Sequence, residues 1–459
     1  MRVKEEFKKS GYFWLPSTSD NKITGTLSIS DSGRIELEYV GQLQMDMNDA
    51  INNHQVDKIV GRTEDGQFVT LEKCLFLNKN LSMFGDEISK GLIQANKIFI
   101  GIGCEENELP HFNTVLFSVE GIDEWVGISG IEAFIENGTQ NATISYNRPE
   151  DIAINLDNGM QLSITFAPSL FNQPKTEIKI IQKTYFKLVC TEEKELNEFI
   201  SVMHKITTLL CLGIDEIVCL DSVEATSNNH YQNFGDIKRN IPIKIYYQSL
   251  PYSSTVPKIE FHQMLFTFGW IKNNFAEIIN NWLNAYETLY VVFDLYFSTK
   301  MEHQKYSDGK FLALVQGLET YHRKTSTQKL MPENEFNELV EKIVSQCPEN
   351  NKKWLEGRLK HGNEINLRKR IENVLEPFKN LIGNCKTQKK LVGNIVATRN
   401  HLTHYEESST SVVEGIDLYF LCLKMEAIFQ LHFLSVLGFS TEEIKSIFDS
   451  TKLQRKLQS

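Results

Sequence analysis

The chain has 459 residues and a formal net charge of −11 at neutral pH, with 41% hydrophobic and 23% charged residues. Its length allows two or three domains, and its composition is ordinary for a soluble globular protein. The acidic balance argues against a general nucleic-acid coat protein. The apolar stretch 418–437 is interrupted by charged and polar residues, so we expect a buried helix there and no membrane span.

The N-terminus and the cysteines both indicate a cytoplasmic protein. The opening letters MRVKEEFKKS are charged and lack the apolar segment of a signal peptide. The eight cysteines form no CxxC pair and mostly lie in apolar runs. We therefore expect reduced core cysteines, with neither a disulfide framework nor a zinc site.

The first 250 residues are predicted to be rich in β-strands. KITGTLSI (22–29) and RIELEYV (34–40) alternate apolar and polar residues around an Asp31-Ser32-Gly33 turn, which predicts a hairpin. Similar alternation recurs at 97–103, 161–166, 177–181 and 242–247. One helix is expected to interrupt the strands, from an N-cap at Thr191 to Gly213. We expect Trp14 and Trp125 to belong to the core.

Beyond Pro257 the apolar residues recur with the period of a helix. The segment SLPYSSTVPK (249–258) supplies the turn residues of a domain boundary. Trp270 and Trp282 are expected to lie in the core. The predicted helices, joined by short polar segments, indicate a helical bundle; they cover 266–297, 310–324, 333–346, 365–378, 389–402 and 417–438.

Positive charge is concentrated between residues 351 and 400. This window has twelve basic and four acidic residues, a net charge of +8, so the remainder of the chain carries −19. Such a window is either a solvated helical surface or a local strip that attracts phosphates. The sequence leaves both interpretations open.

The predicted helix that begins at Lys389 ends in ATRNHLTHYEE. Asn400 and His404 are four residues apart and share a helical face, where the amide could orient the imidazole. Arg399 and His404 are five residues apart, about 140° around a helix. For these two to meet, either the chain leaves the helix near Leu402 or the residues converge across a dimer. The apolar stripe of this helix consists of Leu391, Val392, Ile395 and Val396.

The residue types at this helix end suit RNA cleavage without a metal. That reaction needs a base for the 2′-OH proton, an acid for the 5′-oxygen and a cation for the charge on phosphorus. Histidine titrates near neutral pH and can transfer protons, and arginine is a permanent bidentate phosphate ligand. The spacing alone is expected about once by chance, so it is weak evidence by itself. One Arg and one His per chain favour two chains sharing one cleft.

RNHLTH (399–404) resembles the R-N-x-x-x-H signature of HEPN-family ribonucleases, and the surrounding sequence is similar to the ApeA-type branch. GYFWLP (11–16) with ITGTLSI (23–29) resembles the start of the ApeA N-terminal domain. FLALVQGLETYHR (311–323) and the stretch 418–439 resemble helices that flank the HEPN motif. The resemblance implies a bacterial anti-phage protein that acts by abortive infection, with a toxic, dimeric RNase domain that cleaves RNA, possibly tRNA. It assigns Arg399 and His404 to catalytic positions and Asn400 to the adjacent polar one.

Several residues carry alternative interpretations. Arg399 and His404 could simply offset the dipole of a helix C-terminus. Glu319 and His322 have the spacing of a bundle metal-ligand pair, but a second such motif is missing, so they could instead support the cleft. Arg323 and Lys324 could add phosphate contacts. His401 has no assigned role and is a reserve proton carrier.

The combined expectation is an α+β protein with a β-rich N-terminal domain followed by an all-α HEPN-like helical bundle. Residues 1–250 form the ApeA-like sensor or regulatory domain, 251–300 the connecting helices and 301–459 the ribonuclease domain. We expect a metal-independent endoribonuclease with no cofactor, working as a homodimer with a composite site and triggered by a phage-derived signal. The alternative is a non-catalytic HEPN-type module that binds nucleotide, RNA or protein.

Overall fold

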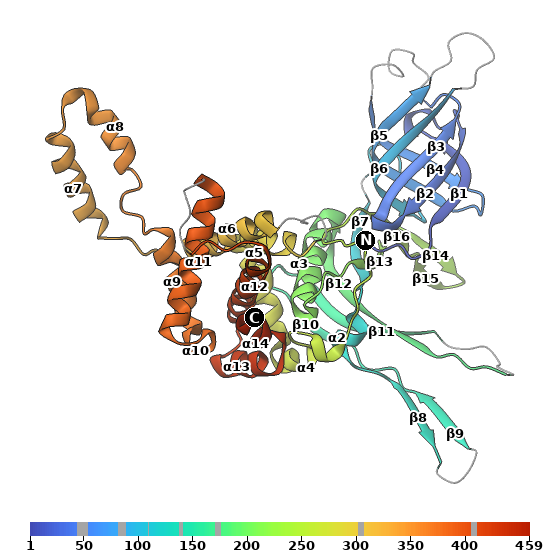
Figure 1. The fold of residues 1–459 in the computed structure, drawn as a ribbon. Coiled ribbons are helices and arrows are strands. Elements are labelled where there is room, and N and C mark those ends of the chain that lie inside the picture. The colour runs from blue at the N-terminus through green and yellow to red at the C-terminus, as the bar shows by residue number, and fades with distance from the viewer. Residues whose placement is uncertain are drawn as a thin grey trace. The chain divides into compact units, whose positions relative to one another are not determined.

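The computed structural model describes residues 1–43, 54–80, 89–108, 110–136, 141–169, 176–301, 307–404 and 411–459. The chain divides into two compact units, Met1–Leu283 and Asn284–Ser459, which are described separately. The first unit contains the strands and the second is built from helices (Figure 1). The predicted fold class, a β-rich region followed by a helical region, is confirmed.

The N-terminal part of the first unit is a closed antiparallel barrel. Its strands pair in the order β6–β3–β2–β1–β4–β5, and a further pairing of β5 with β6 closes the ring. The predicted hairpin is confirmed, because Ile29 of β2 pairs with Ile35 of β3 across the Asp31–Gly33 turn. The barrel strands are β1 (Phe7–Trp14), β2 (Ile23–Ser30), β3 (Arg34–Val40), β4 (Gln55–Thr63), β5 (Phe68–Asn80) and β6 (Lys90–Ile100).

Alternation of side chains fills the barrel with an apolar core. Leu27, Ile35 and Leu37 are fully buried, as the period of two requires for one inward face. Two glycines flank Tyr39 across the sheet, Gly25 on β2 and Gly91 on β6. A Cβ on Gly91 would lie 2.4 Å from the Tyr39 hydroxyl oxygen, so this site admits no larger residue unless Tyr39 moves.

Strand β6 also belongs to the second half of the sheet. Its end, Lys97–Ile100, pairs with β16, and the sheet continues as β16–β13–β7–β12–β11–β10. These strands are β7 (His111–Val119), β10 (Ile152–Asn155), β11 (Gln161–Ser169), β12 (Ile181–Glu195), β13 (Leu220–Thr226) and β16 (Ile243–Tyr247). Separate hairpins are formed by β14 (Tyr231–Phe234) with β15 (Ile237–Asn240) and by β8 (Ile131–Ile135) with β9 (Ala142–Tyr146).

Helices pack against this second half. The long helix α3 (Leu196–Ile214) contacts β7 and β12, and the short helices α2 (Ile122–Val126) and α4 (Phe268–Ile271) contact each other. Trp125 is fully buried, and its indole nitrogen donates to the Phe266 carbonyl over 3.0 Å. The predicted N-cap at Thr191 is wrong. Strand β12 continues through Glu195, because after a bulge Lys194 and Glu195 pair again with β7.

The β8–β9 hairpin extends from the rest of the first unit as an isolated ribbon (Figure 1). Its base is held by Gln182, whose side chain accepts from the Gly130 amide at 2.9 Å and donates to the Ile128 carbonyl at 2.7 Å. Toward its tip, Phe134, Ile135 and Ile144 are 68%, 72% and 52% exposed. The hairpin is therefore anchored at one end and unusually apolar at the other.

The second unit is built around α12 (Gly415–Leu437). The C-terminal half of α5 (Phe275–Ser298) contributes aromatic packing, with Tyr296 contacting Phe429 and Phe433. Helix α12 is long and apolar enough to cross a membrane, but 72% of its apolar window is buried inside the protein, as expected for a core helix. The other helices are α6 (Ser307–Thr325), α7 (Glu333–Ser345), α8 (Glu349–Leu359), α9 (Leu367–Leu375), α10 (Lys379–Ile382), α11 (Cys385–His404), α13 (Thr441–Ser450) and α14 (Lys452–Gln458).

The predicted core residues mostly have the expected burial. Trp282 is fully buried and Trp14 is half-buried, but Trp270 is 43% exposed, so its prediction was wrong. Trp270 follows the buried Phe268 by two residues in the short helix α4 and therefore faces away from it. All eight cysteines are free thiols; six are buried, Cys347 is half-buried and Cys385 is exposed.

Candidate functional site

Helix α11 carries the residues predicted to be catalytic. Leu391, Val392 and Ile395 are buried, which holds one face of the helix against the bundle. Buried Thr398 fastens the end of this face, since its hydroxyl oxygen accepts from the Val413 amide at 3.1 Å. The segment that leads into α12 is thereby attached to α11, six residues before His404.

The helix is continuous through His404. The expectation that the chain leaves the helix near Leu402 is therefore wrong. Thr403 is still part of α11, and its hydroxyl donates to the Arg399 carbonyl at 2.7 Å. Arg399 and His404 consequently remain about 140° apart around α11. Within one chain they do not face each other.

The candidate side chains are accessible to a ligand. His404 is exposed, and Arg399, Asn400 and His401 are half-buried. The Asn400 amide oxygen accepts from the Arg399 guanidinium at 3.3 Å. Among the described residues no hydrogen bond joins Asn400 to His404, so in this arrangement the amide orients the guanidinium and not the imidazole.

Glu319 and His322 of α6 belong to a polar network with α9. The His322 ring is 4% exposed, with Nδ1 3.4 Å from a guanidinium nitrogen of Arg370 and Nε2 3.1 Å from the side-chain nitrogen of Asn373. Burial lowers the pKa of His322, and the cationic side chains of Arg370 and Arg323 lower it further. His322 is therefore neutral at pH 7, and a neutral ring can accept from only one of these two neighbouring side chains.

Carboxylates balance the two arginines of this network. Arg323 lies 3.0 Å from Glu319 and 2.5 Å from Glu364, and buried Arg370 lies 3.1 Å from Glu364. Glu319 is thus engaged by arginine, and no group of three His, Cys, Asp or Glu side chains suited to a metal ion occurs in the described ranges. The network reads as a support that joins α6 to α9, which also packs against α11.

The basic window is divided among four helices, α8, α9, α10 and α11, with different surroundings. Arg370 is paired with Glu364 in the α6–α9 network, and Lys379 is paired with Glu376 at 2.6 Å. Helix α8 has no buried residue and exposes Trp354 by 63%. The cations of α11 remain: Lys386, Lys389 and Lys390 are exposed. The sequence showed the excess of charge but could not show which cations already had partners.

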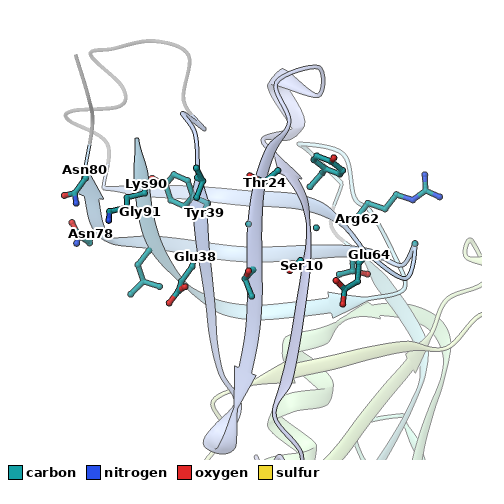
Figure 2. A pocket seen from close by; sticks show the side chains of 18 residues that line it. Ser10, Thr24, Glu38, Tyr39, Arg62, Glu64, Asn78, Asn80, Lys90 and Gly91 are labelled. Atoms are coloured by element: carbon teal, nitrogen blue, oxygen red, sulfur yellow. The ribbon is translucent and has the colours of Figure 1, made fainter. Parts of the chain in front are cut away.

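The first unit contains a separate pocket. It has a volume of about 980 Å³ and is lined by residues of β1 to β6 (Figure 2). Asn78, Asn80 and Lys90 gather at one end, and Arg62 and Glu64 lie at the other. Charges of both signs line it, so the pocket favours no single class of charged ligand.

Comparison with known proteins identifies both units. Residues 8–282 match the ApeA N-terminal domain 1 family, and residues 312–443 match the Apea-like HEPN family. No curated protein and no solved structure matches the chain. The first match covers more than half of the chain, and the second includes the RNHLTH segment of α11. The chain therefore belongs to the ApeA-type HEPN proteins, a family of anti-phage defence.

Proposed function

We propose that the protein is a metal-independent endoribonuclease that uses Arg399 and His404 of two chains. The observation that carries the proposal is the position of an RNxxxH segment on the accessible end of α11, within the HEPN match. A phosphate at this helix end could contact the half-buried guanidinium of Arg399 and the exposed imidazole of His404. We infer that RNA, possibly tRNA, is the substrate, and that the first unit senses a phage-derived trigger.

The chemistry follows from the two side chains. One imidazole removes the proton of a 2′-OH, whose oxygen attacks the adjacent phosphorus while the P–O5′ bond breaks. The imidazolium that forms gives its proton to the leaving 5′-oxygen, so the products are a 2′,3′-cyclic phosphate and a 5′-OH and the histidine is neutral again. Arg399 binds the negative charge that develops on the non-bridging oxygens, and Asn400 holds its guanidinium in place.

Removing either side chain tests the enzyme assignment. We expect Arg399→Ala and His404→Ala each to lower RNA cleavage by at least about 100-fold, since each removes a transition-state interaction. Arg358→Ala on α8 removes an equal charge from another exposed helix and should leave the rate unchanged. Cleavage measured in EDTA should equal cleavage in magnesium. Full cleavage by both site variants would show that these two side chains do not carry the reaction, and no cleavage by the wild-type protein would favour a non-catalytic binding module.

Mixing the two inactive variants tests the shared site. A heterodimer of Arg399→Ala with His404→Ala chains contains one site built from the two intact side chains and one site that lacks both. At equal concentrations about half of the dimers are mixed, so about a quarter of the wild-type activity should return. If the site lay within one chain, every site in the mixture would be defective, and the mixture would stay inactive.

A further inference from the structure

A pocket between α11 and α12 collects three lysines. It has a volume of about 710 Å³ and lies wholly within the second unit. Lys386 and Lys390 line it from α11, and Lys424 lines it from α12. Thr387 and Asn394 add a hydroxyl and an amide to the same wall. These groups are all hydrogen-bond donors, so the pocket is suited to a ligand that accepts.

Helical register explains why the lysines converge. Lys386, Lys390 and Asn394 follow one another at intervals of four and therefore form one stripe on α11. On α12, Asp417 and Lys424 are seven residues apart, two turns along the same face. The pocket is lined by residues of these two helices together with the segment Ser411–Val413 and the C-terminal residues Leu457 and Ser459.

None of the three lysines has an ion-pair partner among the residues that the structure describes. In the described parts of the chain, no carboxylate lies within ion-pair distance of Lys386, Lys390 or Lys424, although Asp417 and the last residue, Ser459, also line the pocket. Lys424 is half-buried, and burial lowers its pKa; the nearby charge of Lys390 lowers it further. The folded protein therefore holds cations close together at an energetic cost that an anion would relieve.

We propose that this lysine pocket binds phosphate groups of the RNA strand that the HEPN domain cuts. The RNA assignment rests on the proposed function, whereas the affinity for phosphate follows from the pocket alone. Phosphate esters fit because lysine binds phosphate as a point charge, and successive backbone phosphates can engage more than one ammonium group. A free nucleotide has the same phosphate chemistry and is the competing source.

The position of the pocket on α11 connects it with the candidate site. By helical register, Lys386, Lys390 and His404 share one side of the helix, and Arg399 lies on the other. Lys390 and His404 are 14 residues apart, roughly 21 Å along the axis. A strand of several nucleotides held in the pocket would thus follow the side of α11 that ends at His404. The pocket then acts in binding and register, and not in the chemical step.

Binding of an uncleavable RNA tests the pocket separately from cleavage. The probe is a fluorescent 2′-O-methyl oligoribonucleotide, which lacks the attacking hydroxyl, and the protein is the full chain. We expect Lys390→Gln and Lys424→Gln each to raise Kd by about three- to tenfold and to reduce the salt slope by about 0.7. Lys389→Gln is the matched control, because it removes the same charge from the adjacent exposed residue, which does not line the pocket.

Two results would overturn the inference. One is an equal loss of affinity in the Lys389→Gln control, which would mean that only general charge matters. The other is unchanged affinity in both pocket variants. Displacement of the probe by ATP at concentrations where inorganic phosphate has no effect would reassign the pocket to a free nucleotide.

The outcome separates this inference from the nuclease proposal. A protein that binds the probe through the lysines but cuts no RNA retains the pocket and loses the nuclease. A protein that cuts RNA, with cleavage and probe binding both unaffected by Lys390→Gln and Lys424→Gln, retains the nuclease and loses the pocket.

Discussion

Two polar regions of the helical unit treat their charges in opposite ways. Between α6 and α9, Arg323 and Arg370 are matched by Glu319 and Glu364, and His322 is kept neutral. Between α11 and α12, three lysines share a pocket, and no described carboxylate lies within ion-pair distance of them. A matched network contributes to the fold by itself, whereas an unmatched cluster is stabilised only when a ligand arrives. The difference distinguishes a structural support from a binding site.

The largest expected effect is the loss of the matched network. We expect Arg370→Ala to destabilise the helical unit by about 3 kcal/mol, because it leaves Glu364 and His322 without their buried partner. Chemical denaturation of the full chain, followed by the helical signal, measures this change. Lys369→Ala removes an exposed neighbouring cation and should stay within about 0.5 kcal/mol of wild type. Similar changes in the free energy of unfolding for both variants would show that the network does not stabilise the helical unit.

Acid should also destabilise the helical unit, through a buried histidine that lies beside the α6–α9 network. His432 of α12 is fully surrounded by protein, with its ring tilted against Tyr321 and edge-on to Phe378. Burial lowers its pKa to about 4, while a hydrogen bond to the Val374 carbonyl opposes the shift. Well above pH 6.5 the ring is neutral in both the folded and the unfolded chain, so it does not change the free energy of unfolding. Below pH 6.5 the unfolded chain takes up the proton first, so stability falls by about 3 kcal/mol between pH 6.5 and 4.

A variant isolates the contribution of that histidine. His432→Gln keeps a nitrogen that can donate to the Val374 carbonyl but does not titrate in this range. Denaturation at a series of pH values should therefore give a flatter profile for the variant than for wild type. Identical slopes between pH 6.5 and 4 would show that other groups cause the acid sensitivity.

The smallest expected effect has the opposite sign. Lys424→Gln should stabilise the unliganded protein slightly, by less than about 1 kcal/mol because solvent screens the group, since it removes a partly desolvated charge that Lys390 repels. The same substitution is expected to weaken RNA binding, so stability and affinity should move in opposite directions. A thermal melt of the unliganded variant measures the gain. A lower melting temperature would place Lys424 with the structural residues of α6 and α9.

Sequence periodicity was sufficient to predict the fold class but not the barrel. Strand and helix periods are local properties, so the hairpin at 23–40 and the long helices could be predicted. Closure of the barrel depends on β5 pairing with β6 and β4 pairing with β1, and pairings between separate strands leave little trace in a single sequence. Thr191 was misassigned for the same reason, because its strand is prolonged by pairing with β7.

The candidate site was predicted in part. The helix and its polar end could be derived from the spacing of Leu391, Ile395 and Arg399. The residue at which the helix ends could not be derived, because no glycine or proline between Arg399 and His404 marks a stop. The partners of His322 lie 48 and 51 residues further along the chain. Lys424 lies outside the basic window, and only the packing of α12 against α11 brings it to Lys390.

The β8–β9 hairpin has a practical consequence for work with this protein. Its register pairs Ile131, Ala133 and Ile135 with Tyr146, Ile144 and Ala142 on one face. The folded hairpin therefore exposes an apolar strip to solvent. Environment-sensitive dyes report unfolding by binding newly uncovered apolar surface. Such a dye has a ready site on the folded molecule, so its fluorescence should start high and rise little on heating. Intrinsic tryptophan emission, led by the enclosed Trp125 and Trp282, offers the cleaner signal.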